Sequence, residues 1–314
     1  MTPATWHEVS RGCPEGASGK NGRGGEPDAR RATLCALAAE AGAVELAREA
    51  EALAARLAEG RFYVACVGQC KRGKSTLINA LVGEAILPAA VVPVTAVVTV
   101  VRHGPERGAR VRLAGGEWSA VDLAALSDYV AEDRNPGNQK GLAAVEVFVP
   151  RRLLATGMCL VDTPGLGSVF ADATAATRAF VPHIDAALVV IGADPPISGD
   201  EVALVEQVAR QVDRVLIVLN KADRLSDIER QEAIRFAERV LAGRLGRPVG
   251  PILHVSATDR LAGVGPPRDW HDLERELDGL ARQSGAALLR AAEARGLELL
   301  LSRLVGEIGA RRDA

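Results

Sequence analysis

Short apolar runs rich in Val, Ile and Leu recur through the middle of the chain and alternate with stretches of helical periodicity. Runs in which nearly every position is apolar are typical of strands that are buried on both faces of a parallel sheet. Amphipathic stretches at 198–212 and 226–243 predict helices that cover such a sheet. We therefore expect a doubly wound α/β domain with a mostly parallel sheet. The runs are FYVACVG, TAVVTVV, AAVEVFV, MCLVD, AALVVIGA, RVLIVLN and PILHVSA.

The segments on either side of this domain, which we expect at 61–283, have different patterns. Residues 1–29 are rich in Gly, Pro and charge, which predicts a disordered leader. Residues 30–60 are rich in Ala and Leu and contain no proline, which predicts one helix that ends at Gly60.

The last segment, 284–314, predicts a second helix outside the nucleotide-binding core. An apolar stripe marks this helix, and the N-terminal helix also carries an apolar face. Pairing of the two helices would bury both faces, so we expect them to pack together. The stripe consists of Leu297, Leu301, Leu304 and Ile308.

Composition excludes some classes of protein. The net charge of the 314 residues is -2, which argues against a global attraction to nucleic acid or anionic lipid. The five cysteines are odd in number and lack CxxC spacing, which favours a reducing compartment. No apolar run approaches the roughly 20 residues of a spanning helix. We expect a cytoplasmic protein whose contact with the inner face of a membrane is at most peripheral.

A phosphate-binding loop follows the first apolar run. GQCKRGKS fits the pattern GxxxxGKS/T, with a strand before it and a helix-forming stretch after it. Gly68 and Gly73 allow the backbone to turn its N–H groups toward phosphate, Lys74 can bridge the β and γ phosphates, and Ser75 can hold Mg²⁺. The loop residues that complete the predicted nucleotide contacts are Gln69, Arg72 and Thr76.

Later motifs distinguish GTP from ATP. LVDTPG ends a strand with Asp162, which can reach the metal, and continues to Gly165, whose N–H can sense a γ-phosphate. NKAD follows another strand, and a carboxylate at Asp223 can accept the two hydrogen bonds that guanine offers. Because parallel strands end at one edge, these motifs predict a guanine-nucleotide site. The remaining predicted base contacts are Asn220, Lys221, Ser256 and Ala257.

Over roughly residues 60–260 the chain resembles the bacterial dynamin-like GTPases of the dynamin superfamily. The motifs that carry this resemblance are GQCKRGKSTLINALVGEAILPAAVVPVTAV, DRNPGNQKGLAAVEVFVP, LVDTPGLGS and ADPPISGDE. The resemblance implies a P-loop GTPase fold, in which Thr95 is the first-switch threonine that closes over Mg²⁺ and the γ-phosphate. It also implies that the flanking helices transmit the nucleotide state.

Full-length relatives continue into a helical stalk and a membrane-contacting tip, which this sequence does not include. We therefore expect GTP hydrolysis coupled to assembly or conformational change, through a G-domain dimer or a longer dynamin-like partner. Membrane contact would be peripheral or through that partner, and we expect no nucleic-acid partner. The alternative is a GTP-dependent scaffold that hydrolyses GTP slowly or not at all.

The loop holds three cations within four residues: Lys71, Arg72 and Lys74. Leu166 occupies the position at which Ras-type enzymes have a water-orienting glutamine, so another catalytic device is needed. Dynamin relatives often hold a monovalent cation at the position of Lys71, and guanylate-binding and atlastin-like relatives have arginine there. Lys71 is accordingly our candidate for a catalytic cation. The alternative is that Lys71 and Arg72 are solvated or contact phosphate in the ground state.

Overall fold

The computed structural model describes residues 36, 44–88, 97–113, 116–164, 184–192 and 197–312. The predicted leader, 1–29, lies outside these ranges, as does most of the first half of the predicted N-terminal helix.

The described strands form one mixed sheet in the order β4-β3-β5-β2-β6-β1-β7-β8-β9. β1 lies between β6 and β7 and is parallel to both, and β8 and β9 continue the parallel half. Antiparallel pairing occurs between β2 and β6 and along β5-β3-β4. The prediction of a mostly parallel sheet is confirmed. The bounds are β1 (Phe62–Val67), β2 (Thr99–His103), β3 (Gly108–Leu113), β4 (Trp118–Val121), β5 (Leu142–Val149), β6 (Met158–Asp162), β7 (Ala186–Gly192), β8 (Val215–Asn220) and β9 (Ile252–His254).

The sequence pattern did not predict β3 and β4. In β3, arginines alternate with Ala and Val, so the apolar run that marks the central strands is missing. In the central strands β1, β6 and β7 every residue is buried, because helices cover both faces of the sheet there.

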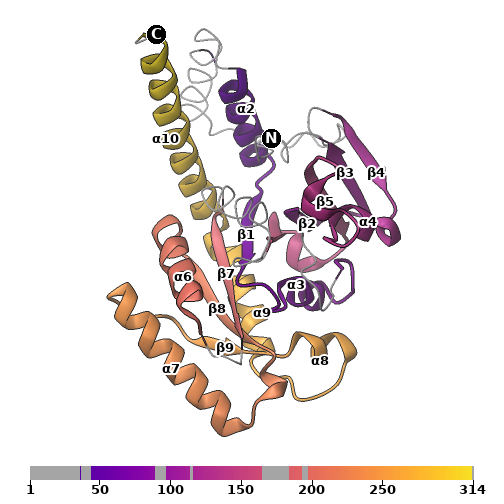
Figure 1. The fold of residues 1–314 in the computed structure, drawn as a ribbon, viewed down its shortest axis with the longest axis vertical. Coiled ribbons are helices and arrows are strands. Elements are labelled where there is room, and N and C mark those ends of the chain that lie inside the picture. Colours follow the sequence, from indigo (N-terminus) through magenta and orange to yellow (C-terminus); the bar gives the residue numbers. More distant parts are fainter. Residues whose placement is uncertain are drawn as a thin grey trace.

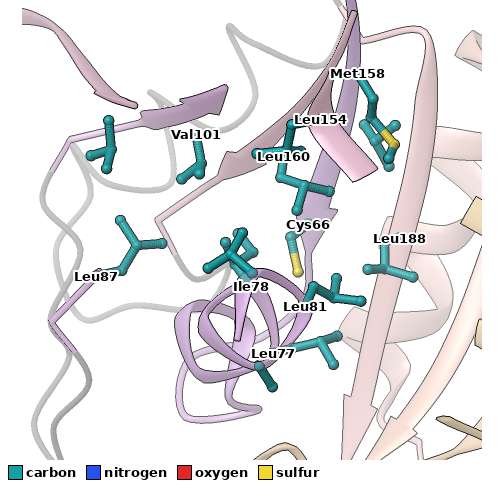
Figure 2. Packing of buried hydrophobic residues seen from close by; sticks show 14 of the residues in the cluster. Cys66, Leu77, Ile78, Leu81, Leu87, Val101, Leu154, Met158, Leu160 and Leu188 are labelled. Carbon is teal, nitrogen blue, oxygen red and sulfur yellow. The ribbon is translucent and has the colours of Figure 1, made fainter. Parts of the chain in front are cut away.

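Helices form a layer on each face of the sheet (Figure 1). α6 and α7 pack their apolar residues against one face. α3, α4 and α9 cover the other face, where Leu77, Ile78 and Leu81 of α3 point toward Cys66 and Leu188 (Figure 2). The bounds are α2 (Val44–Ala58), α3 (Lys74–Val82), α4 (Ser127–Val130), α6 (Gly199–Gln211), α7 (Asp227–Leu245), α8 (Ala257–Ala262), α9 (Trp270–Gly279) and α10 (Gly285–Arg312), with short turns η2 (Leu123–Ala125), η3 (Pro136–Asn138), η4 (Arg152–Leu154), η6 (Ala222–Arg224) and the π-helical η7 (Leu280–Ser284).

α2 and α10 lie side by side and extend beyond one end of the sheet (Figure 1). Their contact is a small apolar cluster in which Leu46 and Ala50 of α2 meet Leu300 and Leu304 of α10. The predicted pairing is therefore correct for the described part of these helices. α2 ends at Ala58, and Gly60 follows with φ 64°, as the predicted helix stop requires.

The apolar stripe predicted on the C-terminal helix is wrong in part. Leu297 and Leu304 do pack toward α2, but Leu301 and Ile308 are 48% and 49% exposed. The face that contacts α2 runs through 297, 300 and 304, a spacing of three and four residues. Residue 301 follows Leu300 by one position and so lies about 100° further around the helix.

Candidate functional site

The phosphate-binding loop connects β1 to α3 and is held closely by its neighbours. A Cβ added at Gly68 would lie 2.4 Å from the carbonyl oxygen of Val190 in β7. Gly73 has φ 87°, and a Cβ there would lie 2.5 Å from Asn220 Nδ2. Both glycines are therefore required, the first for close approach and the second for close approach and a left-handed backbone.

Lys74 and Ser75 are the first residues of α3. The buried ammonium group of Lys74 donates hydrogen bonds to the carbonyl oxygens of Gly68 and Gln69, both at 3.2 Å, and so lies within the loop. Ser75 Oγ donates to Asp162 Oδ2 at 2.6 Å. The structure thus brings together the loop and the aspartate at the end of β6, as the sequence predicted.

The NKAD motif braces the same loop. Asn220 Nδ2 donates to the Arg72 carbonyl at 3.0 Å, and Asn220 Oδ1 accepts from Ala257 N at 3.1 Å. Lys221 Nζ donates to the Lys71 carbonyl at 2.6 Å. Burial lowers the pKa of Lys221, and the nearby guanidinium groups of Arg224 and Arg72 lower it further. One asparagine therefore ties three predicted motifs together at the C-terminal ends of β1, β8 and β9.

Three other predicted contacts lie around this centre. Asp223, in η6, is exposed, so its carboxylate is open to a ligand. Ser256 is buried, and its hydroxyl accepts from Asp259 N at 3.2 Å, which caps α8. Thr76 is half-buried in the first turn of α3. The predicted residues Thr95 and Gly165 lie outside the described residues.

The three loop cations have three different environments. Lys74 lies inside the loop, as described above. Arg72 is buried, and its guanidinium pairs with Glu201 of α6 at 2.7 Å. Lys71 is exposed, has φ 65°, and lines a cavity of about 830 Å³ together with Lys221 and Arg224. Lys71 is therefore the loop cation whose side chain faces open space.

Sequence reasoning missed Glu201 and Gly192. Glu201 lies in the ADPPISGDE stretch, in which Ser198 and Glu201 have the S-x-x-E spacing of a capping box. The structure contains that capping box at the start of α6. The spacing thus identifies the helix start, but no sequence signal connects this glutamate with Arg72, which lies 129 positions earlier.

None of the helices in the described ranges is long and apolar enough to cross a membrane.

Comparison with known proteins agrees with this arrangement. The dynamin family model matches residues 64–222, about half of the chain. An uncharacterised protein in the xynA 3′ region of Caldicellulosiruptor sp. (strain Rt8B.4) is 36% identical over 186 residues, which cover 59% of this chain and 46% of that protein. The bacterial dynamin-like protein of Nostoc punctiforme is 34% identical over 152 residues, or 45% of this chain and 22% of that protein.

The fold also matches a solved structure, an oligomerised bacterial dynamin pair described as providing a mechanism for long-range sensing and tethering of membranes. The TM-score is 0.58 at 19% identity, over 94% of this chain and 58% of that chain. This chain thus spans less than two thirds of the length of each of these three proteins. The family match covers most of β1, the phosphate-binding loop and β8, so the chain belongs to the dynamin family.

Proposed function

We propose that this protein hydrolyses GTP to GDP and phosphate at the C-terminal edge of its parallel strands and couples the cycle to conformational change or assembly. The observation that carries the proposal is the braced loop, in which Lys221 and Asn220 hold the carbonyls of Lys71 and Arg72. A loop that is already ordered loses less entropy when phosphate binds.

In this proposal each end of the nucleotide has its own set of residues. The N–H groups of the loop from Gly68 to Ser75 surround the phosphates, and Lys74 exchanges its carbonyl partners for phosphate oxygens. Asp223 accepts hydrogen bonds from guanine, while Asn220 and Ala257 hold the base-binding loops in register.

A Mg²⁺ ion fits the donor set beside the loop. Ser75 Oγ and Asp162 Oδ2 lie 2.6 Å apart, and both are oxygen atoms that can coordinate a metal ion. Mg²⁺ prefers such oxygen ligands. When bound, the ion would neutralise phosphate charge. Thr95 is proposed as a further ligand and as a catalytic residue, with Gly165 sensing the γ-phosphate.

Lys71 is proposed as the catalytic cation. Its carbonyl is fixed by Lys221, whereas its side chain is exposed at the loop tip. A cation held there can stabilise the charge that develops on the transferring phosphoryl group.

The proposed partner is a second copy of the chain or a longer dynamin-like protein, in the cytoplasm and with at most peripheral membrane contact. The similarity to a solved bacterial dynamin pair supports a pairing step. Size measurements of the protein with GDP, with a non-hydrolysable GTP analogue and with GDP–AlF₄⁻ test this step. An unchanged size in all three would contradict it.

The second candidate is a GTP-dependent scaffold with little turnover, favoured by Leu166 at the position of the water-orienting glutamine. Multiple-turnover phosphate release separates the two functions. Sustained release that is specific for GTP supports hydrolysis. Tight GTP binding with no release beyond the first turnover supports the scaffold.

A further inference from the structure

Arg72 lies inside the loop at the position before Gly73, and its guanidinium group is turned away from solvent. Its exposed fraction is 9%. Arg72 Nε donates to Glu201 Oε1 at 2.7 Å and Nη2 donates to Glu201 Oε2 at 3.0 Å, which is a bidentate pair. Arg72 therefore joins the loop to the first turn of α6.

Glu201 is fully buried, and its carboxylate contacts both the start of α6 and the phosphate-binding loop. Its Oε2 atom accepts from Ser198 N at 2.9 Å, which closes the capping box of α6, in addition to accepting from Arg72. A second contact between the same segments runs from Gln69 Nε2 to Asp200 Oδ2 at 3.4 Å. The start of α6 and the loop are thus fixed to each other.

Gly192, the last residue of β7, makes room for this pair. A Cβ at that position would lie 2.0 Å from Arg72 Nη1 and 2.7 Å from Cζ. The guanidinium group of an unpaired arginine can move aside easily, but that of Arg72 is held by its two hydrogen bonds to Glu201. Any side chain at 192 would therefore displace the guanidinium from its carboxylate.

The backbone of Arg72 is fixed as well, because its carbonyl accepts from Asn220. If the side chain left the pair to contact phosphate, the buried carboxylate of Glu201 would lose its counter-charge, which is unfavourable. We infer that Arg72 is a positioning residue, and that its pair with Glu201 holds the loop in its phosphate-binding shape before the nucleotide arrives. This inference rests on the proposed nucleotide site.

Three variants test the inference from different sides: Arg72→Lys, which loses the bidentate geometry; Glu201→Gln, which keeps an acceptor for Ser198; and Gly192→Ala, which displaces the guanidinium. Affinity for GDP and for a GTP analogue is measured by calorimetry, and melting is measured without nucleotide. We expect each variant to bind both nucleotides about tenfold more weakly than wild type, because the loop holds phosphates that both share.

The pattern across the variants separates positioning from the other roles of an arginine. If the Arg72 side chain contacted phosphate directly, Glu201→Gln would bind GDP within about twofold of wild type, while Arg72→Lys would bind more weakly. A purely structural pair would lower the melting temperature and leave GDP affinity within about twofold of wild type. Either result would overturn the inference, and comparable losses in the variants that fold would support it.

Arg244→Lys is the matched control. Arg244 Nε pairs with Glu206 Oε1 at 3.2 Å and links α7 to α6 without contact with the loop. The Arg244→Lys variant should bind GDP with the same affinity as wild-type protein. Wild-type protein is measured first: failure to bind GDP or GTP overturns the proposed function and the inference with it, whereas normal wild-type binding with unaffected variants overturns the inference alone.

Discussion

The two ends of the central parallel strands hold charge in different ways. At the C-terminal ends, the ammonium groups of Lys74 and Lys221 donate to main-chain carbonyls of the loop. At the N-terminal ends, the Asp185 carboxylate forms ion pairs with Arg295 at 3.0 Å and Arg56 at 3.6 Å. It also accepts a hydrogen bond from the Tyr63 N–H at 2.7 Å. At the first end Lys74 and Lys221 have neutral partners, although Arg72 pairs there with Glu201, and at the second end the cations share one carboxylate.

This difference explains what each end can do. A carbonyl oxygen has no formal charge, so it leaves the positive charge of Lys74 available to an incoming phosphate. A buried carboxylate between arginines compensates their charge and resists separation from them. The nucleotide end is therefore prepared for a ligand, while the other end joins parts of the protein permanently.

The parts joined by Asp185 are the helix pair and the sheet. Arg56 belongs to α2, Arg295 belongs to α10, and Tyr63 belongs to β1, with the guanidinium of Arg56 4.8 Å from the centre of the Tyr63 ring. Burial raises the pKa of Asp185, and the two arginines and the Tyr63 N–H oppose that rise. Movement of the helix pair relative to the sheet would have to break this junction.

The largest effect is expected when the exposed loop cation, Lys71, is removed at the C-terminal ends of the strands. Lys71→Ala should lower kcat by about 10³-fold, the lower end of what a transition-state cation contributes to GTPases, with little change in GTP affinity. Wild-type turnover should be the same in potassium and in sodium. Phosphate release measures kcat, and calorimetry with a non-hydrolysable GTP analogue measures the affinity.

Lys140→Ala is the control for charge removal, since Lys140 is exposed beside Tyr129 and precedes β5, which is three strands from β1 in the sheet. A Lys71→Ala protein that turns over normally, or that loses only affinity, would exclude Lys71 from the mechanism.

The second prediction concerns removal of the Asp185 carboxylate at the N-terminal ends of the strands. Asp185→Ala leaves Arg56 and Arg295 without their shared carboxylate, so the free energy of unfolding should fall by about 3 kcal/mol. GDP affinity of the folded protein should be unchanged. Urea unfolding followed by circular dichroism gives the stability.

Asp272→Ala removes a carboxylate from an exposed pair with Arg275 and should cost less than about 0.5 kcal/mol. Equal losses in the two variants would show that the Asp185 junction is no stronger than a surface ion pair.

The third prediction concerns specificity at the nucleotide end. Asp223→Asn should weaken GTP binding by about 2 kcal/mol, because the amide cannot accept both guanine hydrogen bonds. Xanthosine triphosphate should bind this variant better than GTP does, since its C2 carbonyl accepts where guanine donates. Competition against labelled GDP measures both affinities, and wild-type protein that binds ATP as tightly as GTP would refute the assignment.

The smallest effect tests the contact between the two helices. A Cβ at Gly296 of α10 would lie 2.5 Å from Leu53 Cδ2 of α2, so Gly296→Ala should destabilise the protein by about 1 kcal/mol. Gly306 is in the same helix, and no described atom lies within 4 Å of a Cβ added there. Gly306→Ala should therefore raise stability by up to about 1 kcal/mol. Thermal melting of the two variants should shift in opposite directions, and equal shifts would refute the close crossing at Gly296.

The convergence of the loop with the later motifs was largely predictable because its signals are local. In GQCKRGKS the turn, the glycines and the lysine are contiguous, and NKAD and SA each lie at the end of an apolar strand. Parallel strands place their C-terminal ends at one edge, so the order of the motifs was enough to bring Asn220 to the loop and to Ala257. β3 escaped prediction because arginines alternate with apolar residues along it, so this antiparallel strand lacks the continuous apolar run of the central strands.

The sequence by itself determined the fold class, the loop and the existence of the two terminal helices, because each depends on the periodicity or spacing of neighbouring residues. Only the tertiary structure decided which loop cation is buried, which leucines of α10 meet α2, and where Arg56 and Arg295 converge. Those outcomes depend on partners such as Glu201 and Asp185, more than a hundred positions from Arg72 and Arg56 respectively. The positions of charged residues along the sequence do not show which of them form an ion pair. A buried pair forms only when the folded backbone brings both groups out of water together.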